Sequence, residues 1–403
     1  MSMKSRWFKL KLKRKYLLLK FLFSIMKESS NQEKLFQILG DMRGVPQKYG
    51  QFLYLKDKRK YKGFEKLLDQ GIPFDKDRLY HRAVELTGGG IRLEKDPIAS
   101  ASIGQVYAGT LDNENVIVKV QYPNVKSELI HDWKFIKGII GIVFKFFRFP
   151  EESKKFLVDY LKEFEETVEK ETDYTQEADH QLRFQEVFKG CRHIYIPKIY
   201  ESYIGEDIIV EEKCKGLPLA EFLKIAGEEE KRDVLGILME FYFDSFFKHG
   251  ILHGDPHSGN FFVNNMDGEN ILEIIDFGCV KVYEASYVKN LKELIVFLQK
   301  EEYEQIYSLL IHLGFHREEI SSYGKALIPI LNILFEPFLK DEEFDFKYWR
   351  MSYQLNTIMG SKLFDRTLSL PKELLILFRV FHGLVAHIYT LKEKSFNFYK
   401  FTH

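Results

Sequence analysis

Two short motifs in the second half of the chain constrain its fold more than any other feature of the sequence. The first is His-Gly-Asp-Pro-His-Ser-Gly-Asn, from His253 to Asn260, and the second is Asp-Phe-Gly, which begins sixteen residues later at Asp276. In this order they supply groups that phosphoryl transfer needs: Asp255 can orient or deprotonate a nucleophile, Asn260 can hold a divalent metal, and Asp276 can bridge the metal to nucleotide phosphates. A polar turn before a buried strand is the plainer interpretation. The presence of both motifs, at a separation that suits a hairpin, favours phosphoryl transfer.

Length and composition suit a protein with two packed lobes, since 403 residues can bury two sizeable cores. Lys plus Arg and Asp plus Glu balance at 59 each, so the overall charge gives no reason to expect a nucleic-acid partner. The cysteines Cys191, Cys214 and Cys279 are far apart in the chain and form no Cys-x-x-Cys. They predict a reducing compartment, and neither a disulfide framework nor a zinc site.

Positive charge is concentrated at the beginning of the chain. From Lys4 to Lys27 there are nine Lys or Arg residues and no acidic one, and the eleven residues from Tyr16 to Met26 are apolar apart from Lys20 and Ser24. A helix needs about 20 apolar residues to cross a bilayer, so this segment is too short to span one. Three interpretations stay open: a peripheral segment that binds an anionic membrane, a helix docked on the body of the protein, or a signal or anchor, although no small-x-small cleavage site follows.

A second apolar stretch runs from Leu374 to Leu391 and contains Arg379, His382 and His387. Three polar or titratable groups would be costly inside a bilayer, so we expect a buried helix here rather than a membrane span. Residues from 219 onwards are expected to be mostly helical, apart from the loop and strands around residues 251–282.

The residue pattern in the first half of the chain changes from helical to strand-like near residue 95. Residues 31–95 have helical spacing, with a flexible joint at the glycines 88–90. Beyond them, Gln105–Thr110 and Val116–Gln121 alternate as strands do and are joined by a turn-forming Leu-Asp-Asn-Glu-Asn cluster, and a short strand centred on Ile208–Val210 leads to a hinge. The predicted domains are a basic amphipathic segment (1–30), a helical extension (31–95), a kinase-like N-lobe (96–216) and a helical C-lobe with the catalytic and metal loops (217–403).

Lys119 lies among β-branched residues on the second of these strands. A lysine on a central strand is costly unless it has a partner, and the segment that follows offers Glu177. If that segment is helical throughout, Asp173 and Glu177 lie one turn apart on the same side. Two plainer interpretations stay open: an edge-strand lysine that faces water, and a glutamate on an exposed helix face.

The phosphate-covering Gly-x-Gly-x-x-Gly loop of protein kinases is missing from the first strand pair. In its place stands a segment of small side chains, which lets backbone amides and hydroxyl groups approach phosphates. Alanine restricts φ more than glycine does, so this loop should be stiffer than a glycine-rich one. The residues expected to contact a nucleotide here are Ala99, Ser100, Ala101, Ser102, Ile103, Gly104, Gln105 and Val106.

Taken together, these motifs resemble the UbiB/AarF family of atypical protein-kinase-like ATPases, which is linked to ubiquinone and related isoprenoid-lipid metabolism. The resemblance extends over roughly residues 35–390, and the combination of a Lys-x-Gly-Gln motif with an alanine-rich loop is its most specific part. The matching positions are Lys48-Tyr49-Gly50-Gln51, Ala99-Ser100-Ala101-Ser102, the nucleotide lysine Lys119, Glu171-Thr172-Asp173, the lysine's partner Glu177, the catalytic-loop residues Asp255 and Asn260, and the metal ligand Asp276.

The resemblance implies an α+β, two-lobed protein-kinase-like fold with a helical N-terminal extension. It implies ATP and Mg²⁺ as cofactors, with Asp255 and Lys119 as catalytic residues, Lys119 and Glu177 at the nucleotide, and Asn260 and Asp276 at the metal. The expected function is a Mg²⁺-dependent ATPase that supports ubiquinone or related isoprenoid-lipid biosynthesis. Its expected place is the cytoplasm, peripheral on the inner face of the membrane, with an anionic membrane surface or isoprenoid lipid and a lipid-biosynthesis complex as partners and no nucleic acid.

In this family the extension folds across the active site, where a protein substrate would otherwise lie. By that resemblance Lys48 and Gln51 reach into the cleft near Glu171 and Asp173, which argues against phosphorylation of proteins in trans. The chain departs from the family pattern at Tyr54, where a serine is common, and at Ser258, where a proline is common.

Two other functions stay open. The catalytic-loop motif is also similar to that of small-molecule kinases of the aminoglycoside and choline type, in which Asp255 would act as base for a substrate hydroxyl. A nucleotide-gated scaffold that organises a biosynthetic complex without turnover is the non-enzymatic alternative.

Deletion of residues 1–28 tests the interpretation of the basic segment. If it binds an anionic membrane, the full chain co-sediments with anionic liposomes at low salt and much less at high salt, because salt screens exposed charges. The shortened chain should then stay in the supernatant. Equal sedimentation of both chains, or indifference to salt, would contradict this interpretation.

Overall fold

The computed structural model describes residues 76–100, 103–127, 129–130, 134, 137–138, 172–359 and 371–402. The basic segment and most of the predicted extension therefore lie outside the described residues. The chain divides into two compact units. The first contains residues up to Asp179 and Lys198–Lys213, and the second contains His180–Pro197 and Cys214–His403. The last boundary between the units follows Lys213, and the sequence places the boundary between the lobes at residue 216. Residues 180–197, which the sequence places in the N-lobe, group with the second unit.

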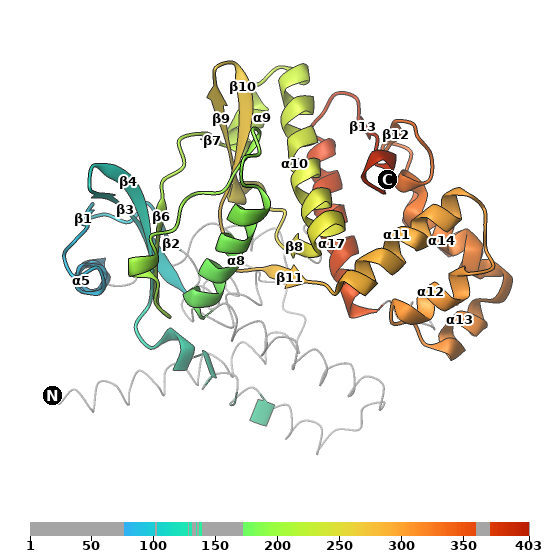
Figure 1. Cartoon of the computed structure of the whole chain (residues 1–403), viewed down its shortest axis with the longest axis horizontal. Coiled ribbons are helices and arrows are strands. Elements are labelled where there is room, and N and C mark those ends of the chain that lie inside the picture. Colours follow the sequence, from blue (N-terminus) through green and yellow to red (C-terminus); the bar gives the residue numbers. More distant parts are fainter. Residues whose placement is uncertain are drawn as a thin grey trace, which may run out of the picture. The chain divides into compact units, whose positions relative to one another are not determined.

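The first unit is built on an antiparallel sheet (Figure 1). Its order is β1 (Arg92–Leu93), β3 (Gly104–Leu111), β4 (Glu114–Gln121) and β6 (Ile208–Glu212), and β2 (Ala99–Ser100) also pairs with β3. The hairpin between β3 and β4 turns at Asp112 and Asn113, whose φ angles of 48° and 68° suit a type I′ turn. Strand β4 therefore lies between two neighbours.

Side-chain alternation on β4 places Val116, Val118 and Val120 on one face, where all three are fully buried. Helix α5 (Lys76–Leu86) contacts this strand and buries Leu79 and Ala83. Lys119 alternates with these valines and therefore points to the opposite face of the sheet.

The second unit is organised around α10 (Glu228–His249), which buries a broad, mainly apolar face that includes Leu238, Phe241 and Tyr242, while Asp233 and Glu240 on the other side are exposed. A sheet of order β5 (Ile194–Tyr195), β10 (Glu269–Ile274), β9 (Phe261–Met266) and β7 (Leu217–Pro218) contacts it, and β8 (Ile251–His253) pairs with β11 (Val280–Val282). Further α-helices and strands of the described part of this unit are α9 (Leu219–Ile225), α11 (Ala285–Gln299), α12 (Ile306–His312), α13 (Arg317–Tyr323), α14 (Leu327–Phe335), β12 (Phe344–Asp345), α15 (Met351–Met359), α17 (Lys372–Ile388) and β13 (Ser395–Phe396).

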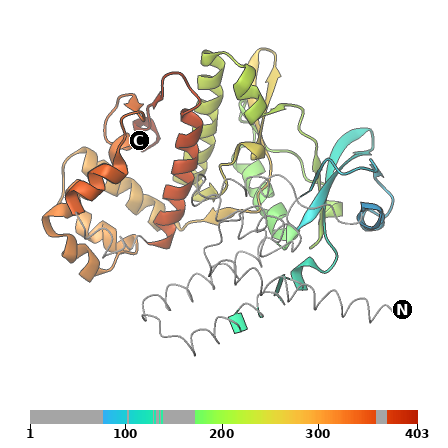
Figure 2. The same cartoon turned by 180° about the vertical axis from the view of Figure 1, so that it is seen from behind.

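Helix α17 carries the second apolar stretch of the sequence, and it lies beside α10 in both views (Figures 1 and 2). Leu374, Leu384 and Ile388 are almost completely buried, so the prediction of a buried helix is confirmed. Across the described ranges, none of the helices combines the length and the apolar character that a membrane crossing requires.

Glu273 on β10 anchors the segment that follows the boundary between the units. Its side chain is 3% exposed, and Oε2 accepts hydrogen bonds from the backbone N–H groups of Lys215 and Gly216, both at 2.9 Å. A Cβ atom at Gly216 would meet the backbone of Val263 at 2.5 Å, which is closer than real Cβ contacts come. Only glycine fits here without moving a strand.

Gly216→Ala should therefore lower the free energy of unfolding by about 1–3 kcal/mol, the usual cost of overpacking. Gly236→Ala is the matched control, because a Cβ atom at Gly236 on α10 meets nothing within 4 Å. That change should be neutral or stabilising by up to about 1 kcal/mol, since alanine favours the helix. Denaturant unfolding measures both, and equal effects would contradict the packing argument.

Candidate active site

The catalytic-loop motif connects β8 to β9 through a short 3₁₀ turn, Ser258–Asn260. Asp255 is exposed, whereas Asn260 is 8% exposed. The amide nitrogen of Asn260 donates to Asp255 Oδ2 at 3.0 Å and to the Asp255 carbonyl at 3.2 Å. These bonds orient Asn260 so that its Oδ1 remains as a candidate metal ligand, and they hold the Asp255 carboxylate in place.

His253 joins this loop to the Asp-Phe-Gly motif from a fully buried position. Its Nε2 lies 2.8 Å from the Asp276 carbonyl, and its Nδ1 lies 3.2 Å from the Tyr242 hydroxyl and 3.4 Å from the Asp255 N–H. A carbonyl only accepts hydrogen bonds, so Nε2 carries the proton and Nδ1 accepts. Burial lowers the pKa of His253 despite the nearby carboxylates of Asp255 and Asp276, which keeps the imidazole neutral.

Tyr242 supplies the donor that this tautomer of His253 requires. Burial raises the pKa of its hydroxyl well above the ordinary value, so the group stays protonated. The two side chains, both fully or almost fully buried, therefore satisfy each other.

Asp276 has a left-handed backbone with φ of 64°, which is uncommon for a residue with a side chain. The next residue, Phe277, is fully buried and packs on Phe184 and on the His253 ring, with centroids 5.1 and 5.5 Å apart. The backbone N–H of Gly278 donates to Asp276 Oδ1 at 3.2 Å. Packing on one side and the His253 bond on the other fix this strained residue, with its carboxylate exposed.

The oxygen donors of Asp276 and Asn260 suit Mg²⁺, which prefers carboxylate and amide oxygens. Within the ranges that the structure describes, His, Cys, Asp and Glu side chains form no group of three or more able to hold a metal. A site with two protein ligands fits a magnesium ion that takes its other ligands from water and phosphate.

Helix α17 packs directly against the catalytic loop, a contact that the sequence did not reveal. His387 Nε2 lies 2.7 Å from the Pro256 carbonyl, and Arg379 Nη2 lies 3.4 Å from the Gly254 carbonyl. A Cβ atom at Gly383 would overlap the ring of Pro256. A glycine inside a strongly apolar helix was the one available signal of this close approach.

In the first unit, Lys119 forms a buried cluster with two carboxylates. Its Nζ lies 2.8 Å from Glu177 Oε1 on α8 (Tyr174–Val187) and 3.0 Å from Glu211 Oε1 on β6. The three side chains are 12%, 9% and 2% exposed. The structure thus excludes an edge-strand lysine and an exposed glutamate, and it adds Glu211, which sequence reasoning missed.

Strand β2 pairs antiparallel with the start of β3, Ala99 with Val106 and Ser100 with Gln105. Gln105 is fully buried; its amide donates to Ser100 Oγ at 3.3 Å and accepts from the Tyr107 hydroxyl at 2.9 Å. Burial raises the pKa of Tyr107 to about 12, so it remains a donor. Ile103 is buried, and a Cβ atom at Gly104 would overlap the Val120 carbonyl.

Asp173 lies just before α8, so the segment is not helical throughout and the one-turn spacing from Glu177, which depended on that, does not apply. Its Oδ1 accepts from the Thr175 N–H at 3.1 Å and the Thr175 hydroxyl at 2.6 Å, which caps the helix. Burial opposes ionisation of Asp173, but hydrogen bonds from Thr175 and Gln176 outweigh it and lower its pKa. The predicted site residues Lys48, Gln51, Ala101, Ser102 and Glu171 lie outside the described residues.

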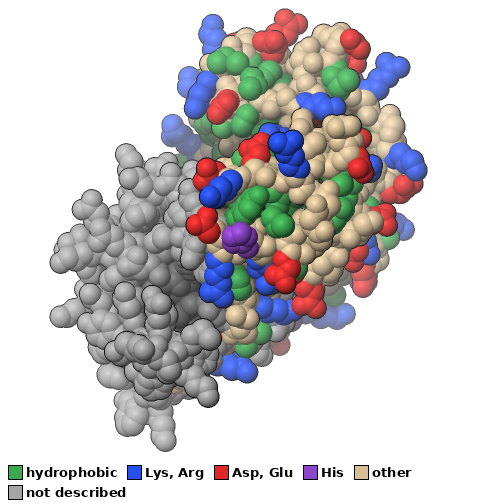
Figure 3. Space-filling model, turned by 90° about the vertical axis from the view of Figure 1, so that its left-hand side faces the viewer, with side chains coloured by type: hydrophobic (Ala, Val, Ile, Leu, Met, Phe, Trp, Pro, Cys, Tyr) green, Lys and Arg blue, Asp and Glu red, His purple; other side chains and the backbone are tan. Residues whose placement is uncertain are grey.

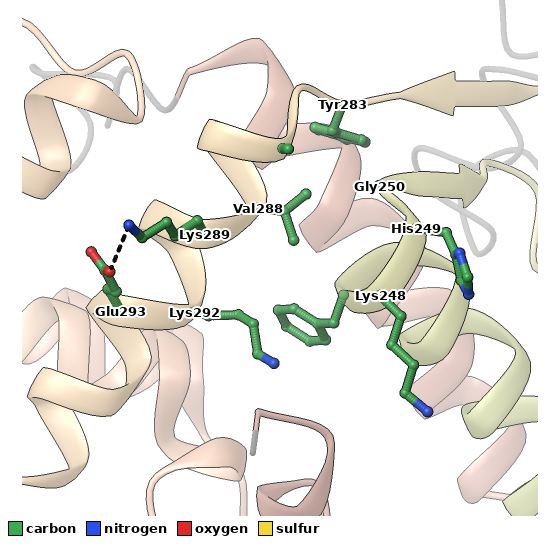
Figure 4. Close-up of a pocket in the computed structure, with 10 residues that line it drawn as sticks. Lys248, His249, Gly250, Tyr283, Val288, Lys289, Lys292 and Glu293 are labelled. Atoms are coloured by element: carbon green, nitrogen blue, oxygen red, sulfur yellow. Dashed lines mark ion pairs between the residues drawn. The ribbon is translucent and has the colours of Figure 1, made fainter.

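A pocket of about 380 Å³ lies elsewhere on the second unit, between the end of α10 and the start of α11. Figure 4 shows Lys248 and His249 on the α10 side and Lys289 and Lys292 on α11, with Lys289 paired to Glu293 at 3.7 Å. None of the predicted site residues lines this pocket. It therefore does not bear on the catalytic-loop chemistry.

Comparison with known proteins gives a consistent result. The family model of the ABC1 atypical kinase-like domain matches residues 91–310. The chain is 24% identical to "Atypical kinase COQ8, mitochondrial" of Saccharomyces cerevisiae, over 90% of this chain and 73% of that protein. It is 27% identical to "Protein ACTIVITY OF BC1 COMPLEX KINASE 8, chloroplastic" of Arabidopsis thaliana, over 62% of this chain and 33% of that protein.

Similarity extends to bacterial proteins and to a solved structure. A "Probable protein kinase UbiB" of Vibrio campbellii is 28% identical over 62% of this chain and 47% of that protein, so the chain spans about half of it. A structure titled "The complex structure of Rv3197-erythromycin from Mycobacterium tuberculosis" has a TM-score of 0.63 at 22% identity, over 95% of this chain and 97% of that one. This likeness shows the fold, in agreement with the predicted α+β kinase-like class.

The neutral state of His253 predicts how stability depends on pH. Because its pKa is lower in the folded protein than the ordinary 6.5, the unfolded chain binds a proton that the folded chain does not, once pH falls below about 6.5. Stability contributed by His253 is thus present above that pH and lost below it, by up to about 1.4 kcal/mol per pH unit.

The free energy of unfolding should therefore fall less between pH 7.5 and 5.5 in His253→Asn than in the wild type, by about 1 kcal/mol. His312→Asn removes an exposed histidine and is the matched control. An unchanged pH dependence in His253→Asn would contradict a buried neutral imidazole.

Proposed function

Since the chain belongs to the ABC1 atypical kinase-like family, we propose that it binds Mg-ATP and cleaves the terminal phosphate, by hydrolysis or by transfer to a small acceptor. The proposal concerns the site residues, because the family itself establishes only a kinase-type domain. The observation that carries it is the ion pair of Lys119 and Glu177 at 2.8 Å. Kinases use this pair to present an ammonium group to the nucleotide phosphates.

Each residue has a defined task in this proposal. Lys119 interacts with the phosphates, and Glu177 orients the lysine. Asp255 accepts a hydrogen bond from the attacking oxygen and aligns it, while the amide of Asn260 fixes the carboxylate. Asp276 and Asn260 would hold Mg²⁺, which neutralises charge on the phosphate oxygens when bound.

The relatives bear on the identity of the acceptor only through their names. Two carry the names COQ8 and UbiB, and the resemblance links the family to ubiquinone and related isoprenoid lipids. We therefore favour an ATPase that supports isoprenoid-lipid biosynthesis at a membrane, rather than a kinase of proteins in trans. A small-molecule phosphotransferase uses the same catalytic loop, and a nucleotide-gated scaffold would keep binding without turnover.

The charge on one face of the described residues bears on the choice of partner. The face in Figure 3 carries Lys and Arg side chains intermixed with Asp and Glu, without a continuous area of one sign. Nucleic-acid binding usually requires a concentrated basic surface.

Asp276→Asn tests the metal role with little disturbance of the backbone, because asparagine tolerates a left-handed φ as well as aspartate does. Mg-ATP should raise the melting temperature of the wild type, since a ligand at 100 times its Kd stabilises the folded state by about 2.7 kcal/mol. The shift should vanish in Asp276→Asn and when Mg²⁺ is withheld.

Asp255→Asn separates binding from turnover. This variant should retain the Mg-ATP shift and lose phosphate release by about 10²–10⁴-fold, the usual contribution of a positioned acid or base. A wild type with binding but no release would support the scaffold. A wild type with no Mg²⁺-dependent shift would contradict the proposed function altogether.

A further inference from the structure

Glu211 is a buried carboxylate for which the proposed chemistry has no use. It pairs across the sheet with Ile117, while Lys119 pairs with Ile209, so Glu211 and Lys119 point to the same face. Its side chain is 2% exposed, and Oε1 lies 3.0 Å from Lys119 Nζ. Its other oxygen, Oε2, is buried and finds no hydrogen-bond partner in the part of the chain that the structure describes.

Among the described residues, Lys119 is therefore held by two carboxylates that lie on different elements. One ammonium group is shared by two carboxylates, at 2.8 and 3.0 Å. A buried carboxylate is costly unless it is paired and its remaining oxygen is hydrogen-bonded. For Glu211, the ion pair with Lys119 is the compensation that the described residues show.

We infer that Glu211 is a positioning residue that restrains Lys119 and thereby weakens nucleotide binding. The inference rests on the proposed role of Lys119 at the phosphates. Phosphates bring further negative charge to a lysine that is already shared by two carboxylates. Any movement of Nζ toward a phosphate also takes from Glu211 the partner that offsets its burial.

This arrangement sets the affinity of the site below what Lys119 and Glu177 alone would give. Loss of a charged hydrogen-bond partner corresponds to about tenfold in an equilibrium constant. The site therefore releases nucleotide more readily, and turnover is less limited by release. Glu177, on α8, holds the lysine in place. Glu211, on the neighbouring strand β6, opposes movement of the lysine toward the phosphates.

Glu211→Gln removes the charge and keeps the shape and one acceptor oxygen. The dissociation constant for Mg-ATP, measured by calorimetry, should fall roughly tenfold in this variant. Glu212→Gln is the matched control, because the next residue on β6 points to the opposite face and should leave the constant unchanged. Glu211→Met, which removes the acceptor as well, should act in the same direction as Glu211→Gln.

A second readout does not depend on nucleotide. An amine-reactive acylating reagent, with sites mapped by mass spectrometry, should modify Lys119 several-fold faster in Glu211→Gln than in the wild type, relative to the exposed Lys198. Removal of one carboxylate leaves the charged ammonium less stabilised, so the reactive neutral amine is more populated. Glu212→Gln should not change this ratio.

The outcomes separate the two claims. Unchanged or weaker Mg-ATP binding in both Glu211 variants, or equal labelling of Lys119, would overturn the role of Glu211 even if the wild type binds Mg-ATP. A wild type that does not bind Mg-ATP, but in which Glu211→Gln still accelerates labelling, would leave the lysine restraint intact and remove the proposed function.

Discussion

The buried imidazole of His253 links the two loops on which the candidate site depends. Its Nε2 donates to the Asp276 carbonyl, and its Nδ1 accepts from Tyr242 and from the backbone of Asp255. Only the neutral ring can make these bonds together, because a protonated ring has no acceptor. The packing that buries the ring keeps it neutral. The same packing brings the backbones of the catalytic loop and of the Asp-Phe-Gly loop to this one side chain.

Aromatic packing also fixes the backbone of the Asp-Phe-Gly loop. Phe277 enters a cluster with Phe184 and His253, so the residue before it is held in a conformation that few non-glycine residues adopt. On the other side, α17 fixes Pro256 through His387 and the close approach at Gly383. The exposed carboxylates of Asp255 and Asp276 are therefore presented by buried and well-packed neighbours, which lowers the cost of ordering them in the proposed chemistry.

The sequence predicted those features that depend on neighbouring residues or on simple alternation. The β3–β4 hairpin, the buried α17 and the burial of a lysine at position 119 all follow from local periodicity and turn chemistry. The sequence left open whether Asp173 lies inside the helix, because a side chain that caps a helix and one in its first turn have similar spacing.

Other features required long-range packing and could not be read from the chain. Glu211 meets Lys119 only because β6 pairs with β4, although the two strands are about ninety residues apart. The available signal in the sequence was the pair Glu211 and Glu212 at the end of an otherwise apolar strand, since two consecutive residues of a strand point to opposite faces. The contact of α17 with the catalytic loop joins segments more than 120 residues apart, and no local pattern specifies such a pairing.

In the proposed function, Asn260 and Asp276 hold a nucleotide-linked divalent metal. Paramagnetic Mn²⁺ in place of Mg²⁺ tests this directly, because it broadens the NMR signals of nearby backbone amides. With a non-hydrolysable ATP analogue present, broadening should centre on Asn260, Asp276 and Gly278, and it should disappear in Asp276→Asn. Broadening centred on other residues, or unaffected by the nucleotide analogue and by the substitution, would contradict the account.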